Sequence, residues 1–349
     1  MKNIESYAAL ACIAIQSNQN DQHGGQSVPN FDYEMVKELQ EAIAELEFNR
    51  YPDESSRELI QAYANVKKLD AGYLIAGNGS DEMLGLMIGY FLGKGKKLLT
   101  LSPDFSMYDY YASMHESEVV KFPCEQDGSF SIADFIEFGR EHHVDMVLFS
   151  NPNNPTGHFV SNAQLCKIAE AFPRIPVIID EAYGEFAKES MLTYLDTYHN
   201  LYVTRTLSKA YGFAGARLGF LISCPSNIAK LKPVLVPYNI SSLTQRAGVI
   251  VLRHAAEYEL LVEEIQLERD MLYHKLKQLK NVTFYPSQAN YLYGRSKYKQ
   301  ELLKAMEKEG IVIRNYEGKD SFRITVGSPA ENAIVLSVLQ EFDRKAVTV

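Results

Sequence analysis

The sequence of 349 residues predicts an α/β fold, in which a mostly parallel sheet with helices on both faces is joined to a smaller α+β region. From about residue 70, short apolar runs alternate with helical stretches such as 81–92 and 161–172. The runs are almost continuously apolar, which is typical of strands buried on both faces. The chain is also too long for one ordinary core. We therefore predict a large domain over residues 30–235 and a small domain formed by residues 1–29 and 236–349.

The individual elements are predicted from local patterns. Residues 1–29 are polar and rich in Asn and Gln, so we expect an N-terminal arm, followed by a helix over Tyr33–Glu47. The strands predicted for the large domain are 73–76, 97–101, 145–150, 176–180, 201–206 and 217–222. Beyond Pro237, apolar residues near helical spacing predict one long helix over about 241–279. The remaining predicted elements are strands at 282–285, 290–293, 311–314 and 321–326 and a last helix over 330–344.

Composition narrows the class of protein. Hydrophobic residues make up 46% of the chain and charged residues 23%, which excludes wholesale disorder. The net charge of −9 argues against nucleic acid or an anionic membrane surface as a partner. No apolar run reaches membrane-spanning length and no secretory signal pattern opens the chain, so we expect a cytoplasmic protein. The four cysteines and eight histidines lack metal-ligand spacing, so we expect no metal.

Polar residues that can carry chemistry follow successive predicted strands. Asn154 lies in a turn with two Asn-Pro steps, Asp180 ends the next strand, and Lys209 and Arg217 follow the one after. The carboxyl ends of parallel strands meet at one edge of a sheet, where open α/β sheets bind ligands. A lysine in such a crevice loses hydration, which favours its neutral amine and makes it a Schiff-base nucleophile. Each residue alone fits a turn, a helix cap or a surface side chain, but together they predict an active site.

The same motifs resemble those of a known family. Asn154-Pro155-Thr156-Gly157, Asp180-Glu181-Ala182-Tyr183, Ser208-Lys209 and Arg217-Leu218-Gly219-Phe220 resemble, in this order, the pyridoxal-phosphate-dependent aminotransferases of fold type I. The resemblance extends over about residues 45–330. Within that family the sequence most resembles histidinol-phosphate aminotransferases, through the stretches 49–53, 206–210, 214–217 and 322–327.

The resemblance implies a role for each residue that would contact the pyridine ring of pyridoxal 5′-phosphate. Lys209 would hold the cofactor aldehyde covalently and then move the substrate α-proton as a base. Asp180 would pair with the pyridinium nitrogen, and Asn154 and Tyr183 would hydrogen-bond the ring oxygen O3′. Phe105 would stack on the ring, since the chain has no Trp.

Further residues are implied for the cofactor phosphate and for the substrate. A helix that opens at the Gly77–Glu82 stretch would point backbone N–H groups at the phosphate. The glycines there do not have the spacing of a dinucleotide-binding fingerprint. Arg323 would bind the substrate α-carboxylate, and Asn18 of the arm would lie near the substrate. The residues implied for the phosphate are Gly79, Ser80, Asp81, Thr206, Ser208 and Arg217, together with Tyr51 from a neighbouring subunit, so the resemblance implies a homodimer.

The implied activity is an aminotransferase of amino-acid biosynthesis. It would move an amino group between a donor, histidinol phosphate or an aromatic or other amino acid, and a 2-oxo acid such as 2-oxoglutarate, by a ping-pong mechanism. The arm departs from the histidinol-phosphate pattern, because Asn18-Gln19-Asn20-Asp21 stands where an Asn-Glu-Asn-Pro-like motif is usual, and Tyr7 is the only candidate for the expected aromatic contact. His23-Gly24-Gly25 and the stretch 285–291 are similar to threonine-phosphate decarboxylases. Such a decarboxylase, or a catalytically silent binding protein with the same fold, stays open as an alternative.

Overall fold

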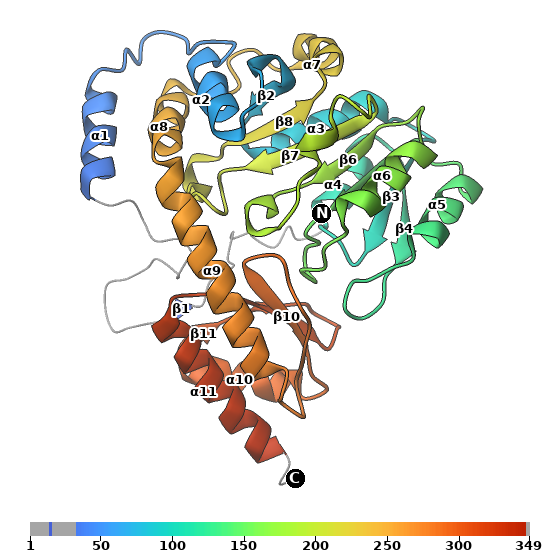
Figure 1. The fold of residues 1–349 in the computed structure, drawn as a ribbon, viewed down its shortest axis with the longest axis vertical. Coiled ribbons are helices and arrows are strands. Elements are labelled where there is room, and N and C mark those ends of the chain that lie inside the picture. Colours follow the sequence, from blue (N-terminus) through green and yellow to red (C-terminus); the bar gives the residue numbers. More distant parts are fainter. Residues whose placement is uncertain (1–13, 16–32, 347–349) are drawn as a thin grey trace.

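The computed structural model describes residues 14–15 and 33–346 and shows a large α/β part and a smaller α+β part, with the long helix α9 (Ala255–Leu276) running from one to the other (Figure 1). The large part is built on a seven-stranded sheet in the order β2-β8-β7-β6-β5-β3-β4. Neighbouring strands from β7 to β4 are parallel, whereas β8 is antiparallel to both β7 and β2. The strands are β2 (Leu74–Gly77), β3 (Lys97–Ser102), β4 (Glu118–Pro123), β5 (Met146–Ser150), β6 (Val177–Asp180), β7 (Leu201–Thr206) and β8 (Gly219–Ser223). The predicted fold class is confirmed.

Helices cover both faces of the large sheet. One face packs against α3 (Gly79–Phe91), α4 (Met107–Met114) and α7 (Pro225–Leu231). The other face packs against α1 (Tyr33–Ala44), α2 (Arg57–Lys67), α5 (Ile132–Glu141), α6 (Asn162–Ala171) and α8 (Ser242–Arg253). Successive residues of a strand point to opposite faces, so Ile178 of β6 packs with the first group and Ile179 with the second. This double burial explains why the strands are apolar almost without interruption.

The small part has its own sheet and core. Its four strands have the order β12-β13-β10-β9, and a separate strand β1 pairs antiparallel with β11. Its core lies between this sheet and the helices, and includes Leu276, Leu302, Phe322 and Leu339. The elements are β1 (Ala14–Ile15), β9 (Thr283–Phe284), β10 (Tyr291–Arg295), α10 (Lys299–Lys308), β11 (Ile311–Val312), β12 (Arg314–Asn315), β13 (Ser321–Thr325) and α11 (Pro329–Ala346).

The structure differs from the prediction in three places. The helix expected over 241–279 is broken at His254, whose ring nitrogens contact Glu38 and Glu257. The first half of the next helix, α9, still packs in the core of the large part, through Ala255, Tyr258, Val262 and Ile265. The strand β4 was not predicted, because at the edge of the sheet only Val120 of its six residues is fully buried and no continuous apolar run marks it. The strand expected over 311–314 is two short strands in different sheets.

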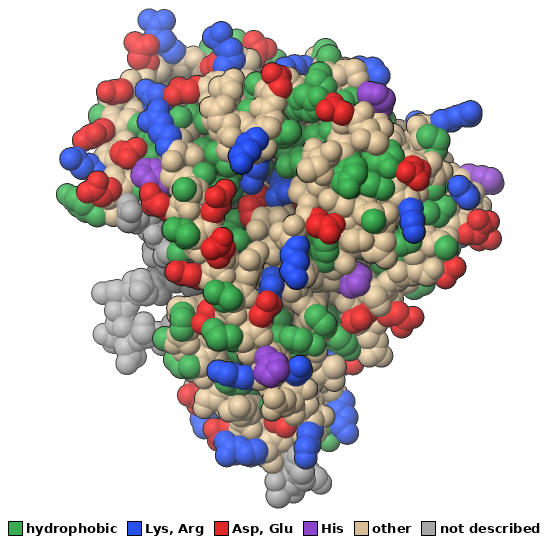
Figure 2. Space-filling view, in the orientation of Figure 1, with side chains coloured by type: hydrophobic (Ala, Val, Ile, Leu, Met, Phe, Trp, Pro, Cys, Tyr) green, Lys and Arg blue, Asp and Glu red, His purple; other side chains and the backbone are tan. Residues whose placement is uncertain are grey.

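The predicted domain boundary at residue 235 stays a prediction. The helix α8 lies beyond that boundary, yet its residues 247 and 249–252 belong to the core of the large part. None of the described helices is both long and apolar enough to cross a bilayer. On the face shown in Figure 2, acidic and basic side chains are interspersed over both parts of the molecule. The described part of this face therefore carries no extended basic surface of the kind that binds nucleic-acid phosphates.

Candidate active site

The predicted residues gather where the two parts of the molecule meet, at the carboxyl ends of the parallel strands. Asp180 ends β6 and Thr206 ends β7, while the small sheet contributes Arg323 from β13 and Tyr291 from β10. Hydrogen bonds join the two parts at this place. The Tyr291 hydroxyl donates to the backbone carbonyl of Asn153 at 2.7 Å, and the Arg323 Nη1 donates to the Asn154 side-chain oxygen at 2.8 Å.

Asp180 is buried and surrounded by hydrogen-bond donors. Its carboxyl group accepts from the hydroxyls of Tyr108 and Thr204, each at 2.8 Å, and from the backbone N–H of Ala182 at 3.2 Å. Desolvation raises the pKa of Asp180 to about 6, although the hydrogen bonds from Tyr108 and Thr204 pull it down. A cation placed against this carboxyl group would stabilise its ionised form, which is the arrangement that a protonated ring nitrogen requires.

Lys209, Tyr183 and Arg323 form a cluster beside Asn154. The Lys209 Nζ lies 5.4 Å from the centre of the Tyr183 ring. Burial alone would raise the pKa of the Tyr183 phenol, but the nearby cations Lys209 and Arg323 outweigh burial and lower it. The Arg323 guanidinium lies over the Tyr291 ring, 4.4 Å from its centre. A phenol with a lowered pKa next to two cations is well suited to accept or share a proton.

One N–H donor of the Arg323 side chain has no hydrogen-bond partner. Its side chain is almost fully buried, and its Nε is a buried atom with no hydrogen-bond partner in the structure. A buried unpaired donor is costly, so this atom points to a ligand with an acceptor oxygen. Its guanidinium geometry suits a planar or tetrahedral anion such as a carboxylate or a phosphate.

The N-terminus of α3 and the start of β8 form an anion cradle. Gly79 has a φ of 80°, and a Cβ on Gly219 would lie 2.2 Å from the Ser80 backbone nitrogen, so both positions require glycine for this close approach. The Asn78 side chain does not cap the helix. The Arg217 Nη2 contacts Asp81 at 2.5 Å. Backbone N–H groups at a helix start beside a guanidinium fit a phosphate monoester.

Two hydroxyl groups lie at the end of β7, the strand next to β8 and its glycine. The Thr206 hydroxyl donates to the Ser208 hydroxyl at 2.9 Å, and the Ser208 backbone N–H donates back to Thr206 at 3.1 Å. Phe105 is half-buried and meets the ring of Tyr108 edge-on, with ring centres 5.6 Å apart. These groups match the donor set and the aromatic surface that pyridoxal 5′-phosphate needs.

Among the predicted residues that the structure describes, Tyr51 is not part of this cluster. Tyr51 is 82% exposed and stacks on Tyr238, with ring centres 4.7 Å apart. Asn18, like Tyr7, lies outside the described residues. Two further groups, Tyr108 and Thr204, hold Asp180 and were not predicted, because neither has a role in the motifs of the sequence. Thr204 could have been found, since it lies two residues before Thr206 on the same face of β7.

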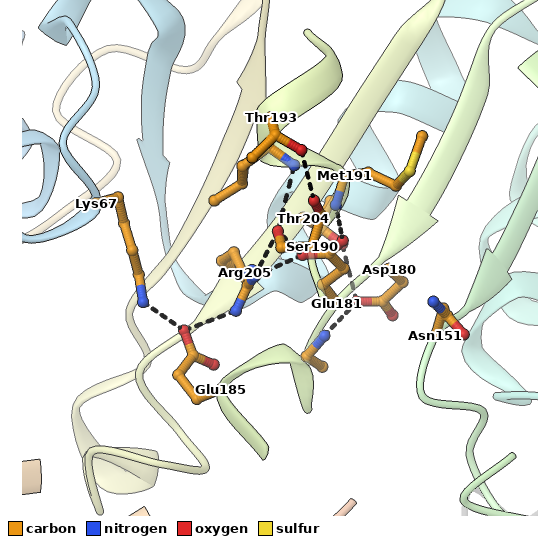
Figure 3. A network of polar contacts seen from close by, with 12 residues as sticks. Lys67, Asn151, Asp180, Glu181, Glu185, Ser190, Met191, Thr193, Thr204 and Arg205 are labelled. Atoms are coloured by element: carbon orange, nitrogen blue, oxygen red, sulfur yellow. Dashed lines mark hydrogen bonds and ion pairs between the residues drawn. The ribbon is translucent and has the colours of Figure 1, made fainter. Parts of the chain in front are cut away.

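A network of buried ion pairs lies next to Asp180 (Figure 3). The Arg205 guanidinium contacts Glu181 at 2.6 Å and Glu185 at 2.9 Å, and Lys67 contacts Glu185 at 3.0 Å. Glu181 also accepts hydrogen bonds from the Ser190 hydroxyl and the Met191 backbone N–H. Arg205 is thus the cation that Glu181 faces. The network anchors the loop that carries Tyr183.

Comparison with known proteins agrees with this geometry. Residues 11–339 match the family model described as aminotransferase class I and II. The chain belongs to this family of pyridoxal-phosphate-dependent enzymes, so the predicted enzyme class and cofactor are confirmed.

The similar proteins include histidinol-phosphate aminotransferases. The one from Clostridium novyi is 35% identical over 310 residues, covering 88% of this chain and 87% of the relative, and the one from Clostridium kluyveri is 36% identical over 313 residues, covering 89% of each. The crystal structure of the histidinol-phosphate aminotransferase from Clostridium acetobutylicum superposes with a TM-score of 0.80 at 25% identity, covering 89% of this chain and 95% of that one. Among residues 14–15 and 33–346, no group of three or more His, Cys, Asp or Glu side chains is arranged to hold a metal ion.

Proposed function

We propose that this enzyme transfers an amino group from histidinol phosphate, or from an aromatic amino acid, to a 2-oxo acid such as 2-oxoglutarate by a ping-pong cycle. The observation that carries the proposal is the convergence of three groups at one sheet edge: the amine of Lys209, the buried carboxyl of Asp180 and the buried Arg323 with an unpaired Nε. The similarity to histidinol-phosphate aminotransferases supports the choice of donor.

The residues present fit pyridoxal 5′-phosphate. When bound, this cofactor supplies an electron sink for the charge that remains after the substrate α-proton is removed. Asp180 would keep the ring nitrogen protonated, helped by the Tyr108 and Thr204 hydroxyls, which orient its carboxyl group. Lys209 would hold the cofactor covalently and carry the α-proton. Asn154 and Tyr183 would hydrogen-bond the ring oxygen.

The other cofactor contacts follow the positions of the side chains. Phe105 would cover one face of the pyridine ring. The phosphate would lie at the start of α3 and the end of β7, held by Gly79, Ser80, Asp81, Thr206, Ser208 and Arg217.

Arg323 would bind both substrates of a ping-pong cycle. Histidinol phosphate has no carboxylate but carries a phosphate, whereas 2-oxoglutarate offers a carboxylate, and one guanidinium can hydrogen-bond either anion. The Tyr291 ring beneath the guanidinium holds its plane fixed. This arrangement would allow a donor and an acceptor of different shape to use one site.

We also propose a homodimer that shares its active sites. Tyr51 and Tyr238 are stacked and exposed, and the exposed Val236 (65%) and Val234 (47%) lie close to Tyr238 in the sequence. Exposed apolar side chains grouped in this way are typical of an interface. Tyr51 would then reach the cofactor phosphate of the other subunit. Mixing inactive Lys209→Ala and Tyr51→Ala subunits at limiting cofactor should restore activity, whereas a fully active monomer in sedimentation would refute the shared site.

The donor is tested with the purified holoenzyme in single-turnover reactions. Histidinol phosphate, phenylalanine and tyrosine are added without a 2-oxo acid, and the absorbance of the bound cofactor is followed. Conversion of the cofactor from its aldehyde to its amine form, reversed by 2-oxoglutarate, is the expected result. Release of CO₂ from a phospho-amino acid without any acceptor would instead make the enzyme a decarboxylase. No conversion with any donor would refute the proposed activity.

A further inference from the structure

Asp104 joins two strand ends beside the cofactor site. Its Oδ1 accepts hydrogen bonds from the Phe105 backbone N–H at 2.7 Å and from the Ser150 hydroxyl at 2.5 Å. Its Oδ2 accepts from the Ser150 backbone N–H at 3.2 Å. Because Asp104 follows β3 and Ser150 ends β5, this single carboxyl group connects the loops that leave two neighbouring strands.

The backbone pairing of these strands explains the need for such a connection. The β3–β5 ladder pairs Leu98 with Met146 and Leu99 with Val147, near the amino ends of both strands. The backbone pairing of β3 with β5 does not extend to the carboxyl ends of these strands, where the candidate site lies. At those ends the Asp104 carboxyl group supplies contacts that a backbone ladder supplies elsewhere in the sheet.

The hydrogen bonds continue from Ser150 to the polar side of the site. The Ser150 hydroxyl donates to Asp104 and accepts from the Asn154 backbone N–H at 2.8 Å. The Asn154 side-chain oxygen then accepts from Arg323. One chain of hydrogen bonds therefore runs from the backbone of Phe105 through Asp104, Ser150 and Asn154 to Arg323.

We propose that Asp104 is a positioning residue, which fixes the aromatic surface of Phe105 relative to the polar pair Asn154 and Arg323. The inference rests on the proposed roles of Phe105 and Asn154 toward the cofactor. Its physical basis is that an aromatic ring and a carboxamide must lie on defined sides of the same pyridine ring, although they come from different loops. Losing a few tenths of an ångström in their relative placement weakens both contacts at once.

The electrostatic setting agrees with a role for this particular side chain. Desolvation, with a smaller contribution from the nearby Asp180, raises the pKa of Asp104 to about 8, although the hydrogen bonds from Ser150 and Phe105 lower it. A carboxyl group in such surroundings costs stability, so a position with a purely structural purpose would favour a neutral side chain. In its ionised form this carboxyl group can accept all three hydrogen bonds, whereas the amide of Asn would direct a donor at the Ser150 N–H or lose the Ser150 hydroxyl.

The test measures how the cofactor is held, independently of any amino donor. The variants are Asp104→Ala and Asp104→Asn, and the readouts are the visible circular dichroism of bound pyridoxal 5′-phosphate and its dissociation constant. Asp145→Ala is the matched control, because the Asp145 carboxyl group accepts from the Lys97 backbone N–H at 2.9 Å and joins β3 to β5 at their opposite ends. Both Asp104 variants should change the dichroism and weaken cofactor binding about tenfold, whereas the control should change neither.

A double-mutant cycle with Asn154→Ala separates positioning from a general loss of stability. If Asp104 acts through Asn154, Asp104→Ala should add little to the loss already caused by Asn154→Ala, whereas independent effects would be additive. If Asp104→Ala does not fold, the same double-mutant cycle is measured with the isosteric variant Asp104→Asn. Wild-type dichroism and affinity in Asp104→Asn, full additivity, or an equal change in Asp145→Ala would each overturn the inference. Failure of amino transfer with every donor would refute the proposed function and leave this result intact.

Discussion

Replacing Arg205 by Met tests whether the buried ion network behind the site stabilises the fold. The Arg205 side chain is only 4% exposed, and its partners Glu181 and Glu185 are 2% and 8% exposed. The variant would leave two buried carboxylates, of which Glu185 still contacts Lys67, whereas Glu181 keeps only the hydrogen bonds from Ser190 and Met191 described above. Breaking a buried ion pair by removing one partner costs about 3–5 kcal/mol, because an uncompensated charge remains in the interior. We expect the free energy of unfolding to fall by about this amount.

The assay is equilibrium unfolding of the cofactor-free enzyme in urea. A second variant, Arg205→Met with Glu181→Leu, removes one of the stranded charges and should recover part of the loss, because an apolar replacement no longer needs a partner. Lys94→Met is the exposed control: Lys94 and its partner Glu116 are 85% and 71% exposed, so this variant should stay within about 1 kcal/mol of wild type.

Two outcomes would refute this reasoning. A loss below about 1 kcal/mol for Arg205→Met would mean that the carboxylates of Glu181 and Glu185 find other partners or take up protons at little cost. A double variant as unstable as the single one would mean that the stranded charge is not the cause. Either result would remove the network as the anchor of the loop that carries Tyr183.

Three further predictions concern the site itself. Lys209→Ala should abolish covalent attachment of the cofactor, and borohydride reduction followed by peptide mapping should find no labelled lysine; label on another lysine would contradict the assignment. Asp180→Asn should leave cofactor affinity largely unchanged but lower kcat by at least about a hundredfold, because the ring nitrogen loses its counter-charge; a kcat within threefold of wild type would exclude that role. Burial and Asp180 raise the pKa of Asp104 to about 8, so the folded cofactor-free enzyme keeps a proton that the unfolded chain releases above about pH 4, and stability should fall as pH rises between these values. Asp104→Asn should remove up to about 1.4 kcal/mol per pH unit of that slope in urea unfolding, and identical slopes would contradict the buried acid.

The parts of the fold that the sequence predicts are those with a local signature. Strands such as Val177–Asp180 are buried on both faces and therefore appear as continuous apolar runs, and this strand ends in Asp180, a polar residue of the candidate site. The edge strand Glu118–Pro123 is only partly buried, with exposed residues interspersed among its apolar ones, and carries no such signal. The helix break at His254 depends on contacts with Glu38, more than 200 residues away, so no local pattern reveals it.

Residues that position the site residues through hydrogen bonds are harder to predict than the site residues themselves. Lys209 and Asn154 belong to recognisable motifs, but the contacts of Asp104 and Tyr108 link residues 46 and 72 positions apart in the chain. Such contacts follow from the order and register of the strands, which a single sequence does not specify. An Asp after a strand is also an ordinary turn residue, so composition alone gives Asp104 no distinction.

The register of two strands places the neighbouring acids Asp180 and Glu181 on opposite faces of the sheet. Asp180 pairs with Thr204 across the parallel strands β6 and β7, and its carboxyl group meets the Thr204 hydroxyl. The next residue of β7, Arg205, points to the opposite face and meets Glu181, the residue that follows Asp180. A shift of one residue in this register would send Glu181 toward the site and bury Asp180 against Arg205. The two acids have similar chemistry, so their different surroundings come from the pairing of two strands rather than from the motif in which they occur.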